Sequence, residues 1–352
     1  MKRFKSIVLV VLVAAVAVGF SVLPAPTVEA QGSAALSVTP RKDYRAIEPG
    51  KGVSDTLVIR NLDRERTLEL SLRVVDFTYS DDGGMAKFML DPDAPQTTWS
   101  LKPFLTAPES VSVAPGESQT IDIRVDIPAN QGAGSFYSAI LYSSGASDGG
   151  NVGLSASTAT LIFAGVPGDV TEKLTLENLG AYSSQTGKYT KFTTETPARI
   201  AYTLKNEGNV VEAPAGTITL KALFGRETLI NNINTNESLA LIGQTRTFET
   251  CIALRSEPVN FNGSREEAST CADAGLWPGF YRVQMDAFYG QNGNLTREIG
   301  GSSWCIYAPW WFVVVLLLAL LFVSYHIWRI VRYIRGKRGG RTSTRTARSR
   351  KR

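Results

Sequence analysis

Residues 118–127 read Ser-Gln-Thr-Ile-Asp-Ile-Arg-Val-Asp-Ile, and this stretch decides the fold class. Apolar residues occupy every second position from 121 to 127, with charged residues between them. Successive side chains of a strand point to opposite faces, so this period of two predicts a strand with one buried face. Residues 57–60 and 68–74 alternate in the same way. We therefore expect an all-β fold for the main part of the chain.

Turn residues separate these runs and place the domains. Pro-Gly pairs occur at 49–50, 115–116 and 278–279. Strands at spacings of roughly 8 to 12 residues with such turns are typical of antiparallel β-sandwiches. Residues 31–308 suffice for two domains, and Val166-Pro-Gly168 marks a boundary. We predict two immunoglobulin-like β-sandwiches, residues 31–167 and 168–308. Tyr281, near the start of an alternating run, is either a tyrosine-corner residue or an inward-facing core residue.

Both ends of the chain carry membrane signals. Residues 1–30 combine a basic start, an apolar stretch and small residues before Gln31, which predicts a signal peptide; an uncleaved anchor is the alternative. Residues 310–328 contain no charged residue and are about long enough to cross a ~30 Å hydrocarbon core. We predict a single transmembrane helix over residues 309–329, with Trp310, Trp311 and Trp328 as membrane-interface anchors.

The charge distribution gives the orientation. Residues 329–352 carry eleven Lys or Arg and no acid, whereas residues 31–328 carry 23 basic and 31 acidic residues. Basic residues accumulate on the cytoplasmic side, so residues 330–352 form the predicted basic cytoplasmic tail and both sandwiches lie outside. This localisation is a single-pass plasma-membrane protein. The net formal charge of +5 comes from the chain ends, so we expect no nucleic-acid partner.

Three cysteines lie on the predicted extracellular side, where thiols oxidise. Cys251 and Cys271 flank a polar loop and form the candidate disulfide, although pairing of Cys271 with Cys305 stays open. In the first case Cys305 is free or links two chains into a dimer. Sequence alone does not decide the pairing.

Few residues in the chain suit catalysis. His326 is the only histidine and lies in the apolar run, so a catalytic triad or a multi-histidine metal site is not expected. Neighbouring acids such as Asp81 and Asp82 stand beside glycines, where turns expose them and leave no raised pKa for acid catalysis. We expect a protein that is not an enzyme, with no cofactor and no metal site.

The stretch from about residue 36 to 143 resembles the first extracellular domain of the WxL-interacting proteins of bacterial cell surfaces, a domain named for peptidoglycan binding. The segments that carry the resemblance are 56–61, 74–84, 99–103, 111–128 and 134–140. The order of signal peptide, two immunoglobulin-like domains, one spanning helix and a basic tail is similar as well. The resemblance implies a domain that contacts the cell wall.

Two functions follow as expectations. In the first, the protein docks on peptidoglycan through its first domain and presents the second to a protein partner. Trp99 and Tyr137 are then the candidate glycan contacts, because aromatic faces stack on sugars. In the second, the protein is a structural envelope-assembly or adhesion subunit that acts through protein contacts alone.

Overall fold

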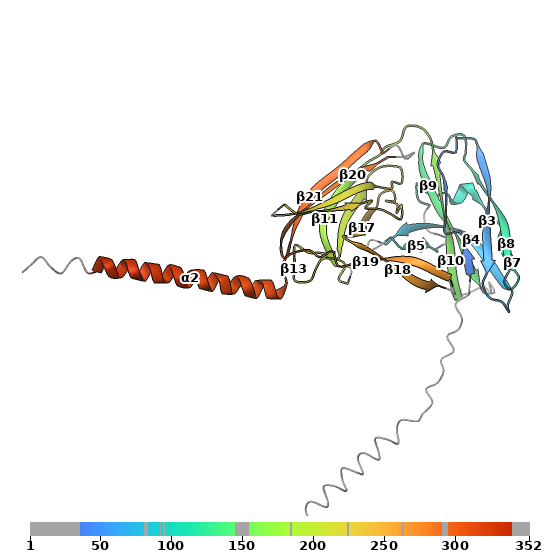
Figure 1. The fold of residues 1–352 in the computed structure, drawn as a ribbon. Coiled ribbons are helices and arrows are strands. Elements are labelled where there is room, and N and C mark those ends of the chain that lie inside the picture. The colour runs from blue at the N-terminus through green and yellow to red at the C-terminus, as the bar shows by residue number, and fades with distance from the viewer. Residues whose placement is uncertain are drawn as a thin grey trace, which may run out of the picture.

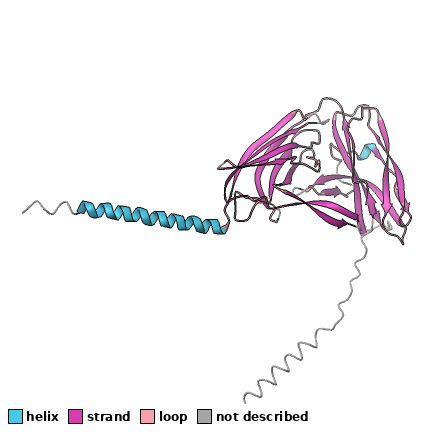
Figure 2. Ribbon diagram, in the orientation of Figure 1, coloured by secondary structure: helices cyan, strands magenta, loops and turns pink. Residues whose placement is uncertain are grey.

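A computed structural model describes residues 36–339 except 81–83, 92, 94–95, 145–154, 184, 224, 262–263 and 291–294. The predicted signal peptide, the Asp81-Asp82 pair and residues 340–352 therefore lie outside the described residues. Two strand-rich units and one long helix make up the described chain (Figures 1 and 2). The all-β prediction with a single C-terminal apolar helix is confirmed.

The first sandwich contains two sheets. One has the order β1-β3-β8-β6, and the other has the order β2-β10-β9-β4-β5, with β7 also paired to β4. Their bounds are β1 Leu36–Val38, β2 Arg41–Tyr44, β3 Gly52–Asn61, β4 Leu68–Tyr79, β5 Ala86–Met89, β6 Leu105–Thr106, β7 Ser110–Val113, β8 Ser118–Asp126, β9 Gly134–Ser144 and β10 Ser155–Val166. A short 3-10 turn, Lys102–Phe104, precedes β6.

The alternating stretch that begins at Ser118 forms β8 and behaves as its pattern predicts. Ile121, Ile123 and Val125 are buried, and the residues between them are exposed. β8 pairs antiparallel with β3, so that Leu57 lies opposite Ile121. The apolar faces of these two strands form one side of the first core.

The second sandwich repeats this arrangement with different strand orders. One sheet is β12-β11-β14-β17, the other is β13-β21-β20-β15-β16, and β18-β19 is a separate hairpin. The bounds are β11 Leu174–Ser183, β12 Lys188–Tyr189, β13 Phe192–Thr193, β14 Arg199–Asn206, β15 Ala215–Ala222, β16 Glu227–Asn231, β17 Thr245–Cys251, β18 Leu254–Phe261, β19 Ser264–Cys271, β20 Gly279–Tyr289 and β21 Arg297–Tyr307. The predicted boundary at 167–168 falls in the linker between β10 and β11.

Tyr281 proves to be both of the things the sequence allowed. Its ring is buried in the second core, and its hydroxyl donates to the carbonyl oxygen of Trp277, four residues upstream, at 2.7 Å. This is the bond of a tyrosine corner. It fixes the turn that leads into β20.

The helix α2, Trp310–Gly339, follows β21 after two residues. Its segment Trp310–Arg335 is long and apolar enough to cross a membrane, and none of its most apolar window is buried in the protein. The helix runs ten residues beyond the predicted end at 329, because Ile330, Val331 and Ile334 continue a helix-compatible pattern among the arginines. The first part of the basic tail is therefore helical and not a separate unstructured segment.

Candidate functional site

The two sandwiches meet across strand β9, which is buried on both faces. One face fills the core of the first sandwich, through Phe136, Ile140 and Tyr142. The opposite face packs against Leu239 and Leu241, which lie in the loop between β16 and β17 of the second sandwich. The residues of that face are Tyr137, Ala139 and Leu141. The contact between the domains is therefore a hydrophobic core of its own.

Aromatic rings form the centre of this interdomain core. The ring centroid of Phe77 lies 5.3 Å from that of Tyr137 and 5.8 Å from that of Phe163. Trp99 stacks on the other side of Tyr137 at 6.1 Å. Such tilted and stacked pairs are favourable beyond the area they bury. The rings of Phe77, Tyr137 and Phe163 come from β4, β9 and β10, so a single sheet of the first sandwich supplies most of the contact.

The predicted glycan contacts lie in this cluster. Trp99 is half-buried, and its indole nitrogen is enclosed without a hydrogen-bond partner among the described residues. Tyr137 is 0% exposed, so a sugar could reach its ring only if the two sandwiches separated. The glycan-contact prediction thus rests on Trp99 in this conformation.

A polar seam runs beside the apolar core. The backbone N–H of Ser135 donates to the carbonyl of Asn209 at 3.0 Å, and the Ser135 hydroxyl accepts from the N–H of Val211 at 3.1 Å. Gly134 stands at the start of β9 with φ of 149°, and a Cβ there would lie 2.8 Å from the carbonyl oxygen of Asn209. Only glycine suits that position, so the close approach of the two backbones depends on it.

Arg246 of β17 closes the other side of the interface. Its guanidinium lies 4.6 Å from the ring centre of Tyr79 and 5.0 Å from that of Phe248, and it donates to the carbonyl of Leu239 at 2.6 Å. Burial lowers the pKa of this guanidinium from its ordinary value, although the group stays charged. Because Tyr79 belongs to the first sandwich and Phe248 to the second, Arg246 links the two domains.

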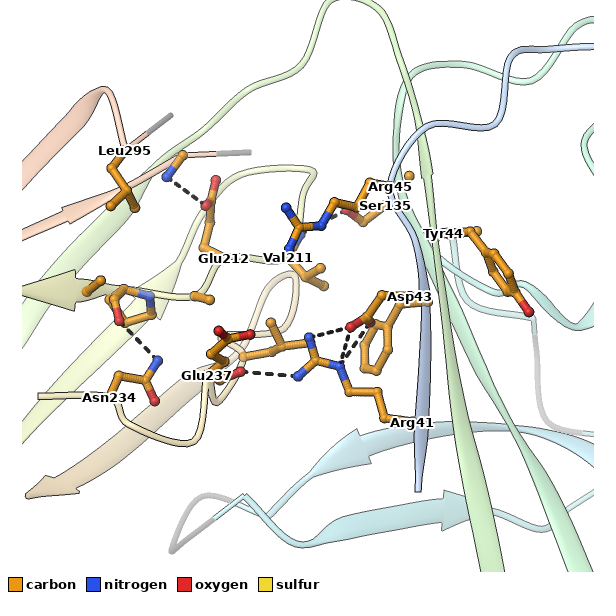
Figure 3. A pocket seen from close by; sticks show the side chains of 18 of the residues that line it. Arg41, Asp43, Tyr44, Arg45, Ser135, Val211, Glu212, Asn234, Glu237 and Leu295 are labelled. Carbon is orange, nitrogen blue, oxygen red and sulfur yellow. Dashed lines mark hydrogen bonds and ion pairs between the residues drawn. The ribbon is translucent and has the colours of Figure 1, made fainter. Parts of the chain in front are cut away.

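A cavity of about 380 Å³ opens next to this core, between the domains. Figure 3 shows Arg41, Asp43 and Arg45 of the first sandwich on one side, and Glu212, Asn234 and Glu237 of the second on the other. Clefts of this size between domains are common places for ligands. It is the principal candidate site in the described part of the chain.

Glu212 is the unusual residue of the cavity. Its side chain is 1% exposed, and one carboxyl oxygen accepts from the N–H of Gly290 at 3.1 Å. The other oxygen, Oε1, has no partner among the described residues. Burial, with a smaller contribution from the charge of Glu172, raises the pKa of Glu212 to about 8. The carboxyl is therefore mostly protonated at neutral pH and can both donate and accept a hydrogen bond.

The opposite wall carries basic side chains. Arg41 forms an ion pair with Asp43 at 2.7 Å and donates to the carbonyl of Glu237 at 3.1 Å, which holds the β16–β17 loop against the first sandwich. Arg45 is exposed and extends toward the cavity (Figure 3). The cavity thus offers one neutral acid and one accessible cation to a ligand.

The cysteines are settled by the structure. Cys251 and Cys271 form a disulfide that closes the base of the β18–β19 hairpin. Cys305 is free and 1% exposed in the second core. A dimer through Cys305 does not fit this position, because the thiol cannot meet a second chain while the sandwich is folded. Pairing of Cys271 with Cys305 is excluded by the observed bond.

The predicted membrane anchors all lie on α2. Trp310 is 74% exposed at its first residue, Trp311 follows it, and the ring of Trp328 has the guanidinium of Arg332 5.1 Å from its centre. Their role at the membrane surface remains a prediction. Among the described residues no three His, Cys, Asp or Glu side chains group as metal ligands do.

Two stretches of the sequence point to the cleft, although neither entered the sequence-based prediction of a site. Residues 136–142, Phe-Tyr-Ser-Ala-Ile-Leu-Tyr, are apolar on both faces of a strand, which is typical of burial on both sides. Glu212 lies in an apolar, proline-containing stretch, Val210-Val-Glu-Ala-Pro214, where a charged side chain is out of place. The pairing of these two segments depends on the domain arrangement.

No protein-family model and no curated protein matches the chain, so the resemblance to WxL-interacting proteins stays a hypothesis. Similar solved structures include the chaperone DraB of E. coli, at 13% identity over 76% of this chain and 98% of that one, with a TM-score of 0.32. The class 5 fimbriae chaperone CfaA matches at 10% identity over 77% and 99%, with a TM-score of 0.33. A PapD-like domain of human CEP192 covers 42% of this chain and 95% of its own, at 12% identity and a TM-score of 0.27. The likeness concerns the β-sandwich fold alone.

Proposed function

We propose that this chain is a membrane-anchored surface protein that binds a segment of a protein partner in the cleft between its two sandwiches. The observation that carries the proposal is the buried Glu212, whose free carboxyl oxygen lines the 380 Å³ cavity opposite Arg45. α2 anchors the chain, and the accumulation of basic residues after it places both sandwiches outside the cell.

An extended peptide suits the chemistry of this cavity. Each residue of such a segment presents one N–H donor and one C=O acceptor, and a protonated carboxyl can pair with both. The guanidinium of Arg45 offers several donors to a carbonyl or a carboxylate. A buried polar atom without a partner costs free energy, so a ligand that satisfies Oε1 of Glu212 gains affinity from the contact. The polar seam and the aromatic core hold the two walls at a fixed separation.

Photo-crosslinking in native membranes tests this proposal. A photoreactive residue is placed at Arg45 in the full chain, and the matched control carries it at Val58, which is 48% exposed on the first sandwich away from the cavity. We expect a discrete protein adduct from position 45 only. Glu212→Ala should reduce that adduct, whereas Glu212→Gln, which keeps a neutral donor and acceptor, should retain it. Equal adducts at both positions, or no response to Glu212→Ala, would contradict the proposal.

Docking on peptidoglycan is the second part of the proposal, supported by the resemblance of residues 36–143 and by the partly accessible ring of Trp99. Its test is co-sedimentation of the detergent-solubilised full chain with isolated sacculi at two salt concentrations. Trp99→Ala should weaken salt-resistant binding, and Trp277→Ala, which removes a 70% exposed indole from the second sandwich, should not. Failure of the wild-type chain to sediment would leave protein contacts as the sole function, as in the envelope-assembly alternative.

A further inference from the structure

The outward face of strands β20 and β21 changes character along its length. On β21, Cys305 and Tyr307 point into the second core, so Trp304 and Ile306 point outward. On β20, Tyr281 is buried in the same way and Phe280 is exposed. Sheet register shows which outward residues lie side by side, and each row of neighbours is about 7 Å further from the helix than the one before.

The row nearest α2 is apolar. Ile306 pairs with Phe280 on one side and with Phe192 on the other, and Leu223 donates its backbone N–H to the carbonyl of Phe280. Leu223 is 67% exposed, Phe192 55% and Phe280 37%. Trp277, in the turn before β20, is 70% exposed. Large apolar side chains grouped in this way mark a contact surface.

The second row combines an aromatic ring with basic groups. Trp304 pairs with Arg282, which pairs with Lys221. The ring of Trp304 stacks on Phe280 at 6.0 Å, and the ammonium of Lys191 lies 4.9 Å from the ring centre of Trp304. Arg282 and Lys191 are both exposed. The row thus offers cations directly behind the apolar row.

The next rows on these two strands are polar. Ser302 pairs with Gln284, and Gly300 pairs with Asp286. The order from α2 outward is therefore apolar, aromatic with basic, uncharged polar, and acidic. The same order holds across a membrane surface, where acyl chains give way to anionic phosphates and then to water.

The position of α2 identifies the occupant. β21 ends at Tyr307, and α2 begins at Trp310. Ala308 between them donates its N–H to the carbonyl of Thr193 at 2.9 Å, so the chain stays tied to β13 until the helix starts (Figure 1). The apolar row therefore lies within a few residues of the point where the helix enters the bilayer.

We propose that this corner of the second sandwich, defined by Phe192, Leu223, Phe280, Trp304, Lys191 and Arg282, rests in the lipid surface of the membrane that α2 spans. The aromatic and apolar side chains enter the upper acyl region, and Lys191 and Arg282 pair with lipid phosphates. The ectodomain is then held at a fixed angle to the membrane and does not swing on the short connection. The inference rests on the proposed anchoring by α2 but not on the cleft as a binding site.

A fluorescence experiment on the full chain tests this placement. The chain is reconstituted in phosphatidylcholine vesicles containing phosphatidylglycerol, with an environment-sensitive fluorophore on Phe280→Cys or on Phe288→Cys. Phe288 lies on the same strand and face at its far end and is similarly exposed, 40% against 37%. Cys305 is buried, so the introduced thiol is the reactive one. We expect lipids with a spin label near the top of the acyl chain to quench position 280 several-fold more strongly than position 288.

A second arm separates docking from mere proximity to the helix. With the fluorophore on Leu223→Cys, the double variant Phe280→Ser with Trp304→Ser should lose most of the lipid quenching, and Phe288→Ser should keep it. Equal quenching at positions 280 and 288, or no response to the double variant, would overturn the proposal and leave the corner as a surface for a protein. A full chain that does not float with the vesicles would refute the anchoring itself, whereas failure of crosslinking at Arg45 would affect only the cleft.

Discussion

Strands β9 and β20–β21 each belong to a sheet with apolar residues on both faces, yet the two second faces meet different surroundings. The outward face of β9 packs on the second sandwich, and its Tyr137 is 0% exposed. The outward face of β20 and β21 keeps Phe280 and Trp304 exposed beside α2. A second apolar face therefore predicts a second contact, but its partner depends on what the fold places next to the sheet. For β9 the partner is the same chain, and for β20–β21 we infer the membrane.

The largest expected effect separates the stabilities of the two faces. Phe77→Ala removes a fully buried ring from the interdomain core and should lower the free energy of unfolding by about 3–5 kcal/mol. Phe280→Ala should change it by no more than about 0.5 kcal/mol, because the ring is partly exposed in detergent. Guanidinium titration of the two variants in micelles measures both. Equal losses would show that the two faces do not differ as described.

The next effect concerns the acid at the interdomain contact. The folded pKa of Glu212, about 8, lies above its ordinary 4.5, so the folded state binds the proton more tightly. Its stabilising contribution is full below about pH 4.5 and is lost as the pH rises toward 8, by at most about 1.4 kcal/mol per pH unit. Glu212→Gln cannot ionise and should flatten this dependence. Thermal unfolding from pH 5 to 8 compares the two chains, and parallel curves would contradict the raised pKa.

A glycine pair tests the backbone contact between the sandwiches. Gly134→Ala places a Cβ 2.8 Å from the Asn209 carbonyl at a φ of 149°, and should cost roughly 1–3 kcal/mol. Gly132→Ala, two residues away, meets nothing within 4 Å and should be nearly neutral. Chemical denaturation of both variants provides the measurement. An equal response of the two would mean that the seam does not constrain the domains.

The smallest effect compares neighbouring residues on β21. Cys305 points into the core, and burial raises the pKa of its thiol to about 11, so it should react with a thiol reagent only after unfolding. Trp304, the preceding residue, points outward, and an introduced Trp304→Cys thiol should react at once. Reagent titration before and after denaturation measures both, and non-reducing gels should show no dimer through Cys305. Rapid native labelling of Cys305 would contradict its burial.

Much of the fold was predictable from local patterns. The alternation at 121–127 specified β8 and its buried face, and the Pro-Gly pairs marked strand starts that the structure contains. The Cys251–Cys271 disulfide was the leading pairing. The cleft was not predicted, because Glu212 and Arg45 are 167 positions apart and only the packing of the two sandwiches brings them to one cavity. Tyr137 was expected on a surface, and the contact with Leu239 and Leu241 that buries it joins different domains.

The sequence by itself determined the all-β class, the spanning helix and the cysteines available for pairing, because each depends on side-chain periodicity, on apolar length or on residue type along a short stretch. The tertiary structure alone decided which apolar faces are covered, that Glu212 loses its solvent and that Cys305 is inaccessible. Burial is a property of neighbours that are distant in the chain, and the pKa of a carboxyl and the accessibility of a thiol follow from burial.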